Sequence, residues 1–353
     1  MSASTQPEIS IIIKALNEER HIRAAIESAL AALRGMQGEI ILADSGSTDR
    51  TVEIASNYCI RIVQLANPAQ RCCGVGPQLG FQFARGKYIY ILDGDMELNA
   101  DFIGNAVRVL KSDPTLAGVA GLVEEASAEN HHFRGRQMRG LEGRVGACRW
   151  LDMGGLYRRD ALRSVGYMSN RNLYSCEEQE LGLRLSARGW KMRRLSCRSV
   201  FHHGHTDPTF TLQLRRIRSG YLYGPGQVLR SALGTPYFWS AVAIHHHLIA
   251  TLGLWLMLIA GILLLPVTHV MLMLWVLSFC ALFAQRVYRY RSFSAACIDI
   301  VLWHVDAIAL VLGALRPMVD PMTPVDTNLI FDGKVPQTTH QALQPAIAVL
   351  PES

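Results

Sequence analysis

Two carboxylates follow one short apolar segment in the first third of the chain. Residues 88–92 read Tyr-Ile-Tyr-Ile-Leu, a β-rich run of the kind that forms a buried strand. Asp93 and Asp95 come directly after it with only Gly94 between them, although an Asp-Gly pair is also common in solvated turns. In open α/β sheets, ligands bind beyond the carboxyl ends of the strands. Two acids at that position suit a Mg²⁺ or Mn²⁺ ion that is chelated together with a substrate phosphate.

Apolar runs and helical patterns alternate before these aspartates. We expect Asn17 to cap the first helix, and we expect strands at 9–13, 39–43 and 60–65 and helices at 17–33, 51–57 and 79–84. Such a succession predicts an α/β domain with a mostly parallel sheet and helices on both faces. The glycine-rich stretch 74–80 lacks the G-x-G-x-x-G spacing of a dinucleotide-binding loop and is expected to be an ordinary loop.

A third acid, Asp44, ends the strand expected at 39–43 and precedes small hydroxyl-bearing residues. A carboxylate there can accept hydrogen bonds from a nucleobase imide or a ribose hydroxyl. It can also cap the following helix, which Ser47, Thr48 or Asp49 could do equally well. Together with the two aspartates, this position favours a nucleotide-sugar site.

Three motifs in order carry a family resemblance: ISIIIKALNEE at 9–19, EIILADSGSTDRT at 39–51 and ILDGD at 91–95. Together they resemble the inverting family 2 glycosyltransferases with a GT-A (Rossmann-like) fold, over roughly the first 230 residues. The resemblance implies that Asp44 recognises the base, that Asp93 lies near the ribose, and that Asp95 binds the metal. The nucleotide-sugar-binding residues that it implies are Ala15, Asn17, Glu18, Asp44, Asp93, Gly154 and Gly155.

Two departures from the family pattern leave the nucleotide open. Lys14-Ala-Leu replaces the frequent Pro-Thr-Tyr before Asn-Glu, and 77–80 read Pro-Gln-Leu-Gly where Arg-Asn-x-Gly is common.

The general base is expected at the start of a helix, in Cys176-Glu-Glu-Gln-Glu-Leu. The family pattern there is Glu-Asp-x-Glu-Leu, whose aspartate is the base, and Glu178 takes that position. An inverting transfer needs such a carboxylate to accept the proton of the attacking hydroxyl. Glu177 is the competing residue, and favourable charge at a helix N-terminus is the purely structural account of these acids.

Histidines at 202, 203 and 205 follow the expected strand around Val200. The resemblance implies that one of them completes the metal shell, and His202 is favoured over His203 and His205. A zinc site is the rival interpretation, but the eight cysteines form no C-x-x-C pair. The cysteines are therefore expected to be free thiols in a reducing compartment.

The chain becomes strongly apolar after Tyr237. Residues 244–265 and 267–284 contain no Lys, Arg, Asp or Glu, and each run is long enough to cross a bilayer. Arginines flank the outer ends of this pair, which predicts a hairpin with both ends in the cytoplasm. Residues 295–315 form either a third span or an interfacial helix; the span is favoured although Asp299, His304 and Asp306 interrupt it.

The net charge of +6 comes from arginine clusters and fits an anionic membrane face or phosphorylated substrates. No nucleic-acid partner is expected. The N-terminus has no basic segment before a long apolar core, so no signal peptide is expected either. Residues 213–217, Gln-Leu-Arg-Arg-Ile, echo the Gln-x-x-Arg-Trp motif of processive polysaccharide synthases, with isoleucine in place of the tryptophan.

The predicted organisation is a cytosolic GT-A domain at 1–235, a transmembrane region at 236–316 and an irregular tail at 317–353. We expect a hexosyltransferase of the inner (cytoplasmic) membrane that depends on Mn²⁺ or Mg²⁺. It would transfer a sugar from a UDP- or GDP-sugar to a lipid-linked acceptor such as a polyprenyl phosphate, in cell-envelope polysaccharide biosynthesis. The alternatives are a processive polysaccharide synthase and a non-catalytic nucleotide-binding membrane scaffold.

Overall fold

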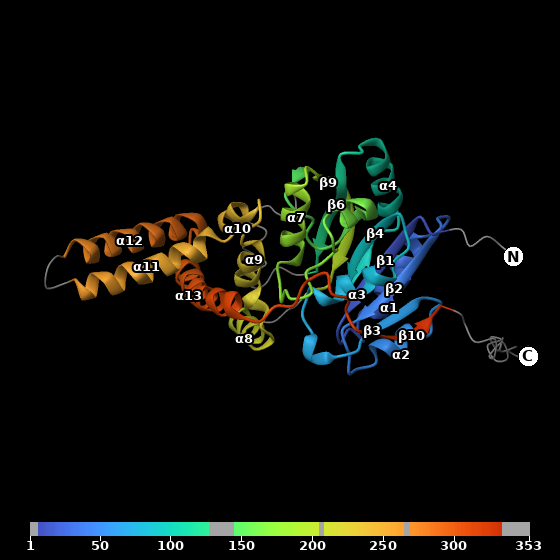
Figure 1. Ribbon diagram of the computed structural model, residues 1–353, viewed down its shortest axis with the longest axis horizontal. Helices are drawn as coiled ribbons and strands as arrows, with labels where there is room; N and C mark the ends of the chain where they lie inside the picture. Colours follow the sequence, from blue (N-terminus) through green and yellow to red (C-terminus); the bar gives the residue numbers. More distant parts are fainter. Residues whose placement is uncertain (1–5, 127–144, 205–207, 265–268, 334–353) are drawn as a thin grey trace, which may run out of the picture.

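The computed structural model describes residues 6–126, 145–204, 208–264 and 269–333. An α/β domain forms one end of the molecule, and a long helical hairpin projects from the other end (Figure 1). Short helices between them join the two parts.

The α/β domain is built on one mixed sheet with the strand order β10-β3-β2-β1-β4-β8-β6-β9-β5, and β7 pairs with β9. The strands β1 to β4 pair in parallel with one another, whereas β8 runs antiparallel to both β4 and β6. β6 and β9 pair in parallel again, while β5 and β7 run antiparallel to β9, so the sheet is mixed and its uninterrupted parallel part is β1 to β4. The strand bounds are β1 Ile9–Ala15, β2 Gly38–Asp44, β3 Arg61–Leu65, β4 Tyr88–Asp93, β5 Met96–Leu98, β6 Leu116–Glu125, β7 Gly146–Cys148, β8 Gly155–Arg158, β9 Lys191–His202 and β10 Thr327–Asp332.

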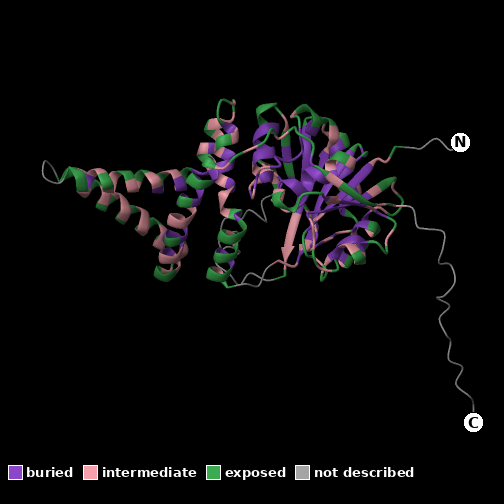
Figure 2. Cartoon of the chain, turned by 60° about the horizontal axis from the view of Figure 1, so that its bottom comes forward, coloured by how far each residue is buried: buried purple, intermediate pink, exposed green. Residues whose placement is uncertain are grey.

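Helices cover both faces of this sheet, because alternate residues of the buried strands point to opposite sides. Ile11 of β1 packs in the cluster that contains α1 and α4, while Ile12 packs in the cluster that contains α3 and α7. Figure 2 shows the resulting buried sheet between partly exposed helices. The helix bounds in this domain are α1 Ile22–Ala32, α2 Thr51–Ala55, α3 Val75–Phe83, α4 Phe102–Ser112, α6 Arg159–Ser164 and α7 Glu177–Ala187.

Two local expectations are wrong. Asn17 does not cap a helix: its φ is +58°, and its side-chain oxygen accepts a hydrogen bond from the Thr48 backbone N–H at 2.8 Å. The helix begins only at Ile22. The glycine-rich stretch is also not a loop, since α3 starts at Val75. A Cβ on Gly80 would lie 2.3 Å from Ile12, so glycine here permits close packing of the helix on β1.

The second part of the chain is helical, with α8 Thr209–Ser219, α9 Gly224–Ala232, α10 Phe238–Ile244, α11 His246–Leu263, α12 Val270–Tyr290 and α13 Phe293–Leu315. The helices α11, α12 and α13 are long and apolar enough to cross a membrane. The hairpin predicted at 244–284 corresponds to α11 and α12, and its connecting turn at 265–268 lies outside the described residues. Most of the hairpin surface is exposed or intermediate (Figure 2).

The tail expected to be irregular contains a strand. β10 pairs antiparallel with β3 at the edge of the sheet, and nearby Val325 is 2% exposed. An edge strand such as β3 offers unpaired backbone groups, and the returning chain satisfies them. Residues 334–353 of the tail lie outside the described part of the chain.

Helix α13 docks on α9 through two glycines. A Cβ on Gly226 would lie 1.9 Å from the Leu310 carbonyl oxygen, and one on Gly313 would lie 2.2 Å from the Tyr223 carbonyl oxygen. The Arg230 guanidinium also donates hydrogen bonds to the Ala314 and Arg316 carbonyls. Backbone contact thus holds α13 close to α9.

We expect Gly226→Ala to destabilise the full-length protein by about 1–3 kcal/mol, because its methyl group has no space against α13. Gly104→Ala is the matched control: nothing lies within 4 Å of its Cβ position in α4. That change should be neutral or stabilising by about 0.5–1 kcal/mol. Chemical denaturation in detergent measures both, and equal stability of the two variants would contradict the glycine contact.

Candidate active site

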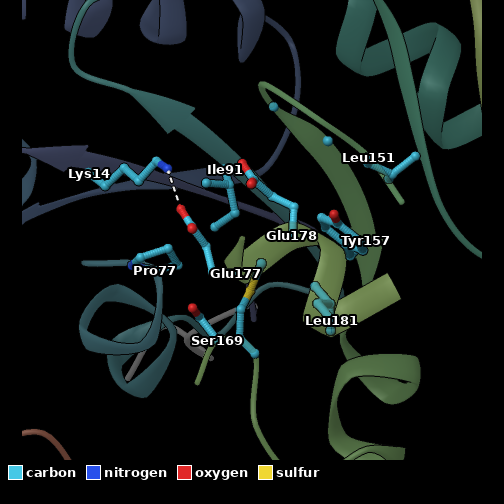
Figure 3. A pocket seen from close by; sticks show the side chains of 12 residues that line it. Lys14, Pro77, Ile91, Leu151, Tyr157, Ser169, Glu177, Glu178 and Leu181 are labelled. Atoms are coloured by element: carbon cyan, nitrogen blue, oxygen red, sulfur yellow. Dashed lines mark hydrogen bonds and ion pairs between the residues drawn. The ribbon is translucent and has the colours of Figure 1, made fainter. Parts of the chain in front are cut away.

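A pocket lies where the carboxyl ends of β1 and β4 meet the N-terminus of α7 (Figure 3). Lys14 enters it from β1, and Glu177 and Glu178 enter it from α7. The residues that line it are Lys14, Pro77, Ile91, Leu151, Gly154, Gly155, Tyr157, Met168, Ser169, Glu177, Glu178 and Leu181. Glu178, Gly154 and Gly155 of the predicted set are therefore brought together in one cavity.

Lys14 connects three elements at this pocket. Its ammonium Nζ lies 3.1 Å from Asp93 Oδ1 on β4 and 3.2 Å from Glu177 Oε1 on α7. Burial lowers the pKa of Lys14, but the charges of Asp93, Glu177 and Glu178 outweigh it and hold the pKa well above its ordinary value. Lys14 was not predicted from the sequence. Its departure from the family's Pro-Thr-Tyr pattern was the only signal.

Glu178 points into the pocket between the ends of β4 and β8 (Figure 3). Burial raises the pKa of its carboxyl well above the ordinary value, the neighbouring Glu177 raises it further, and Lys14 opposes both. Glu180 in the same helix has a different role. It is fully buried, pairs with Arg184 at 2.8 Å and accepts a hydrogen bond from the Tyr167 hydroxyl. That buried pair fixes the first turns of α7.

Asp95 and His202 lie together beside the pocket. Asp95 Oδ2 is 3.3 Å from His202 Nε2, and Glu125 Oε2 is 2.7 Å from Nδ1 of the same ring. Burial lowers the pKa of His202, but its hydrogen bonds and charge interactions with Asp95 and Glu125 raise it to about 9. Glu125 was not predicted from the sequence. The hydrogen bond orients the His202 ring toward Asp95, as a carboxylate commonly does for a ligating histidine.

The other two histidines are placed differently. His203 Nε2 contacts Glu97 Oε1 at 2.8 Å, and the ring stacks on His21 with centroids 4.4 Å apart. His205 lies outside the described residues. Among the described residues, no group of three or more His, Cys, Asp or Glu side chains has an arrangement that would hold a metal ion by itself.

Asp44 is fully buried at the end of β2 and is satisfied within its own loop. Its carboxylate accepts hydrogen bonds from the Gly46 and Ser47 N–H groups, each at 2.9 Å, and from the Gln64 amide at 2.8 Å. Asp49 precedes the N-cap residue Arg50 of α2 and accepts a hydrogen bond from the Thr51 N–H at 3.0 Å. These contacts give Asp44 a clear role in fixing the loop, and base recognition by it stays a prediction.

The other predicted ligand residues surround the turn at Gly94. The Gly94 N–H donates to the Lys14 carbonyl, and the Ser45 N–H donates to the Ala15 carbonyl, each at 2.9 Å. Glu18 lies over Gly94, where a Cβ would approach the Glu18 Cγ to 2.8 Å. Burial raises the pKa of Glu18 to about 8, and Asp95 and Asp93 add to the effect.

The two glycines at 154 and 155 permit close packing. Gly154 has a φ of +93°, and a Cβ there would lie 2.8 Å from the Tyr90 hydroxyl. A Cβ on Gly155 would lie 2.8 Å from Leu151. Both glycines therefore allow the backbone to pack closely against neighbouring side chains at the pocket wall. Their contact with a sugar stays a prediction.

Comparison with known proteins agrees with this geometry. Residues 10–166 match the sequence model of glycosyl transferase family 2. This segment is a glycosyl transferase family 2 domain. It contains β1 through β8, and therefore Lys14, Asp93 and Asp95, while α7 and His202 follow it in the chain.

Curated relatives match the family 2 domain over part of their length. The chain is 34% identical over 108 residues to the low-salt glycan biosynthesis hexosyltransferase of Haloferax volcanii, covering 30% of this chain and 25% of that one. It is 31% identical over 112 residues to the dodecaprenyl-phosphate galacturonate synthase of Rhizobium johnstonii, covering 30% and 32%. The chain thus spans only a quarter to a third of these relatives.

The family 2 domain and the helices after it also resemble a solved structure. A mannosyltransferase from Pyrobaculum calidifontis, in complex with GDP-Man and Mn²⁺, superposes with a TM-score of 0.55 at 16% identity. The superposition covers 88% of each chain. At this identity the similarity shows the fold, which is GT-A.

Proposed function

We propose that this protein is an inverting, metal-dependent hexosyltransferase. It transfers a sugar from a UDP- or GDP-sugar to a polyprenyl-phosphate or other lipid-linked acceptor in cell-envelope glycan synthesis. The observation that supports this best is the pocket itself: Glu178 on α7 faces the end of the β4 strand that carries Asp93 and Asp95. The family 2 domain supports the nucleotide-sugar donor.

The residues beside the pocket fit a divalent cation. Neighbouring ligands of an octahedral ion at about 2.1 Å lie about 3 Å apart, and the Asp95 oxygen and His202 nitrogen lie 3.3 Å apart. Two protein ligands suffice where substrate phosphates and waters complete the shell, as is usual for Mg²⁺. Asp95 and His202 would hold the ion, which would neutralise charge on the leaving nucleoside diphosphate.

Glu178 performs the proton transfer. Its carboxylate accepts the proton of the attacking acceptor oxygen, which is a saccharide hydroxyl or the P–OH group of a polyprenyl phosphate, as that oxygen forms a bond to the anomeric carbon. The bond from the anomeric carbon to the diphosphate oxygen breaks with its electron pair on the diphosphate, and the configuration inverts. Tyr157, Ile91 and Leu151 line the pocket around Glu178, exclude water and limit competing hydrolysis.

A lipid-linked acceptor is supported by the helices α11 and α12, which are apolar and mostly exposed or half-buried. We propose that only this hairpin crosses the membrane. β10 follows α13 in the chain and pairs with β3 in the catalytic sheet, so the chain enters and leaves the helical region on one side. The number of membrane crossings must then be even. We therefore propose that α13 does not cross the membrane and lies along α9 at the membrane surface. Arginines at both outer ends favour the cytoplasmic side.

The assignment of the base predicts that Glu178→Gln lowers kcat by about a hundred- to ten-thousand-fold while the donor KM stays near its original value. Glu177→Gln should cost far less, because Glu177 is paired with Lys14. Glu53→Gln, an exposed change at a surface ion pair, is the control. Transfer of radiolabelled sugar on membranes measures each variant. A dead Glu177→Gln beside an active Glu178→Gln would place the base one residue earlier.

The metal assignment predicts that Asp95→Asn abolishes Mn²⁺-dependent binding of the nucleoside diphosphate, because the ion loses a charged ligand. Titration calorimetry with UDP and with GDP, with and without Mn²⁺, measures this without turnover. Asp101→Asn changes an exposed acid at the start of α4 and should bind as the unaltered protein does. Unchanged metal-dependent binding in Asp95→Asn would refute the assignment.

The topology predicts opposite labelling of two introduced cysteines in intact cells. Val270→Cys, at the start of α12, should react with an impermeant maleimide from outside. Val319→Cys, after α13, should react only after permeabilisation, as should native Cys59 on the catalytic domain. All three positions are exposed in the fold. Labelling of Val319→Cys from outside would show that α13 crosses as a third span.

A further inference from the structure

Lys14 is surrounded by five carboxylates, two in the lining of the pocket and three beside it. Glu18, Asp93 and Asp95 follow or face the ends of β1 and β4, and Glu177 and Glu178 begin α7. The Lys14 side chain is 18% exposed and makes its two ion pairs across the gap between the strands and the helix. Its own carbonyl accepts the Gly94 N–H, so the same residue also fixes the turn between the two aspartates.

The ion pairs of Lys14 distinguish Glu177 from Glu178, which the sequence alone does not do. Successive residues at a helix start project in directions about 100° apart. Figure 3 shows Glu177 turned toward Lys14, whereas Glu178 lies toward Ile91 and Tyr157. Glu177 is 7% exposed, and its ion pair with Lys14 offsets part of the cost of burying its charge.

We propose that Lys14 is a positioning residue of the transfer reaction: by binding Glu177 and Asp93, it leaves Glu178 as the carboxylate that faces the acceptor. This inference deepens the proposed function and rests on it. Lys14 itself needs no contact with either substrate in this role.

The charges around Glu178 make the proposal measurable. Glu177 and Cys176 stand beside it on α7, Lys14 faces it from β1, Asp93 from β4, Asp152 from the segment before β8, and Tyr157 from β8. Lys14 lowers the pKa of Glu178, and Glu177, Asp93 and Asp152 raise it. Because the base must be deprotonated, a higher pKa moves the rise of kcat to higher pH.

The experiment compares Lys14→Met, Glu177→Gln and the double variant in the full-length protein. One readout is the pH dependence of kcat together with the donor KM. The other is infrared titration of the Glu178 carboxyl, identified by the band that Glu178→Gln removes, which requires no turnover. Lys111→Met removes an exposed surface lysine that pairs with Glu8 and is the matched control.

Lys14→Met should move the acid limb of kcat and the infrared midpoint upward by about one to three pH units, the usual effect of one nearby charge. The kcat that is lost on the acid side of the profile should be recovered at high pH. Glu177→Gln should move both downward, and the double variant should lie between them. The control should match the unaltered protein.

Two results would overturn the role of Lys14. One is an unmoved midpoint in Glu177→Gln. The other is a Lys14→Met protein whose donor KM rises while its acid limb stays in place. If Lys14→Met does not fold, the double variant and Glu177→Gln still decide, since neither leaves Glu177 charged and unpaired. If the infrared midpoints move as expected but the protein has no transfer activity, the role of Lys14 is supported and the proposed function is refuted.

Discussion

Crowding of carboxylates in a partly dehydrated pocket is the constraint on which the rest of this structure depends. An isolated carboxylate is costly to bury, and several together repel one another. The protein meets this cost in two ways. Lys14 forms ion pairs with Asp93 and Glu177. Burial and mutual repulsion raise the pKa of Glu18 and of Glu178, which reduces the charge that must be accommodated.

The sheet and the helix α7 hold these groups in place. Lys14 and Asp93 are direct partners in the register of β1 and β4, so their proximity is fixed by the sheet. The buried pair of Glu180 and Arg184 fixes α7 and therefore the direction of its first glutamates. Such rigid support matters because a displacement of about 1 Å at a reacting group can cost a hundredfold in rate.

The helical region also contacts the loop that leads into α7. Residues 169–176 lead into α7 and contact the segment that returns from α13. Arg171 donates hydrogen bonds to the carbonyls of Thr323 and Pro324, and Asn172 donates one to the Val319 carbonyl. Gln227 on α9 binds the same loop at Tyr174 and Asn172. The loop before Glu177 is thus held between α9 and the segment that joins α13 to β10.

The sequence by itself determined the parts that depend on local pattern. Uninterrupted apolar runs predicted β1, β2 and β4. Long uncharged runs predicted the helices α11 and α12. These predictions succeed because strand burial and membrane length are properties of contiguous residues.

Tertiary structure alone decided the contacts between distant segments. Glu125 meets His202, and Lys14 meets Glu177, across 77 and 163 positions of sequence, and no local pattern encodes such pairs. The strand β10 is another example. Its sequence predicts an irregular tail, and the strand forms because β3 provides hydrogen-bond partners. Asn17 and the start of α3 were misplaced because capping and glycine signals yield to long-range packing, here with Thr48 and Ile12. Local propensities are worth tenths of a kcal/mol, and buried contacts are worth more.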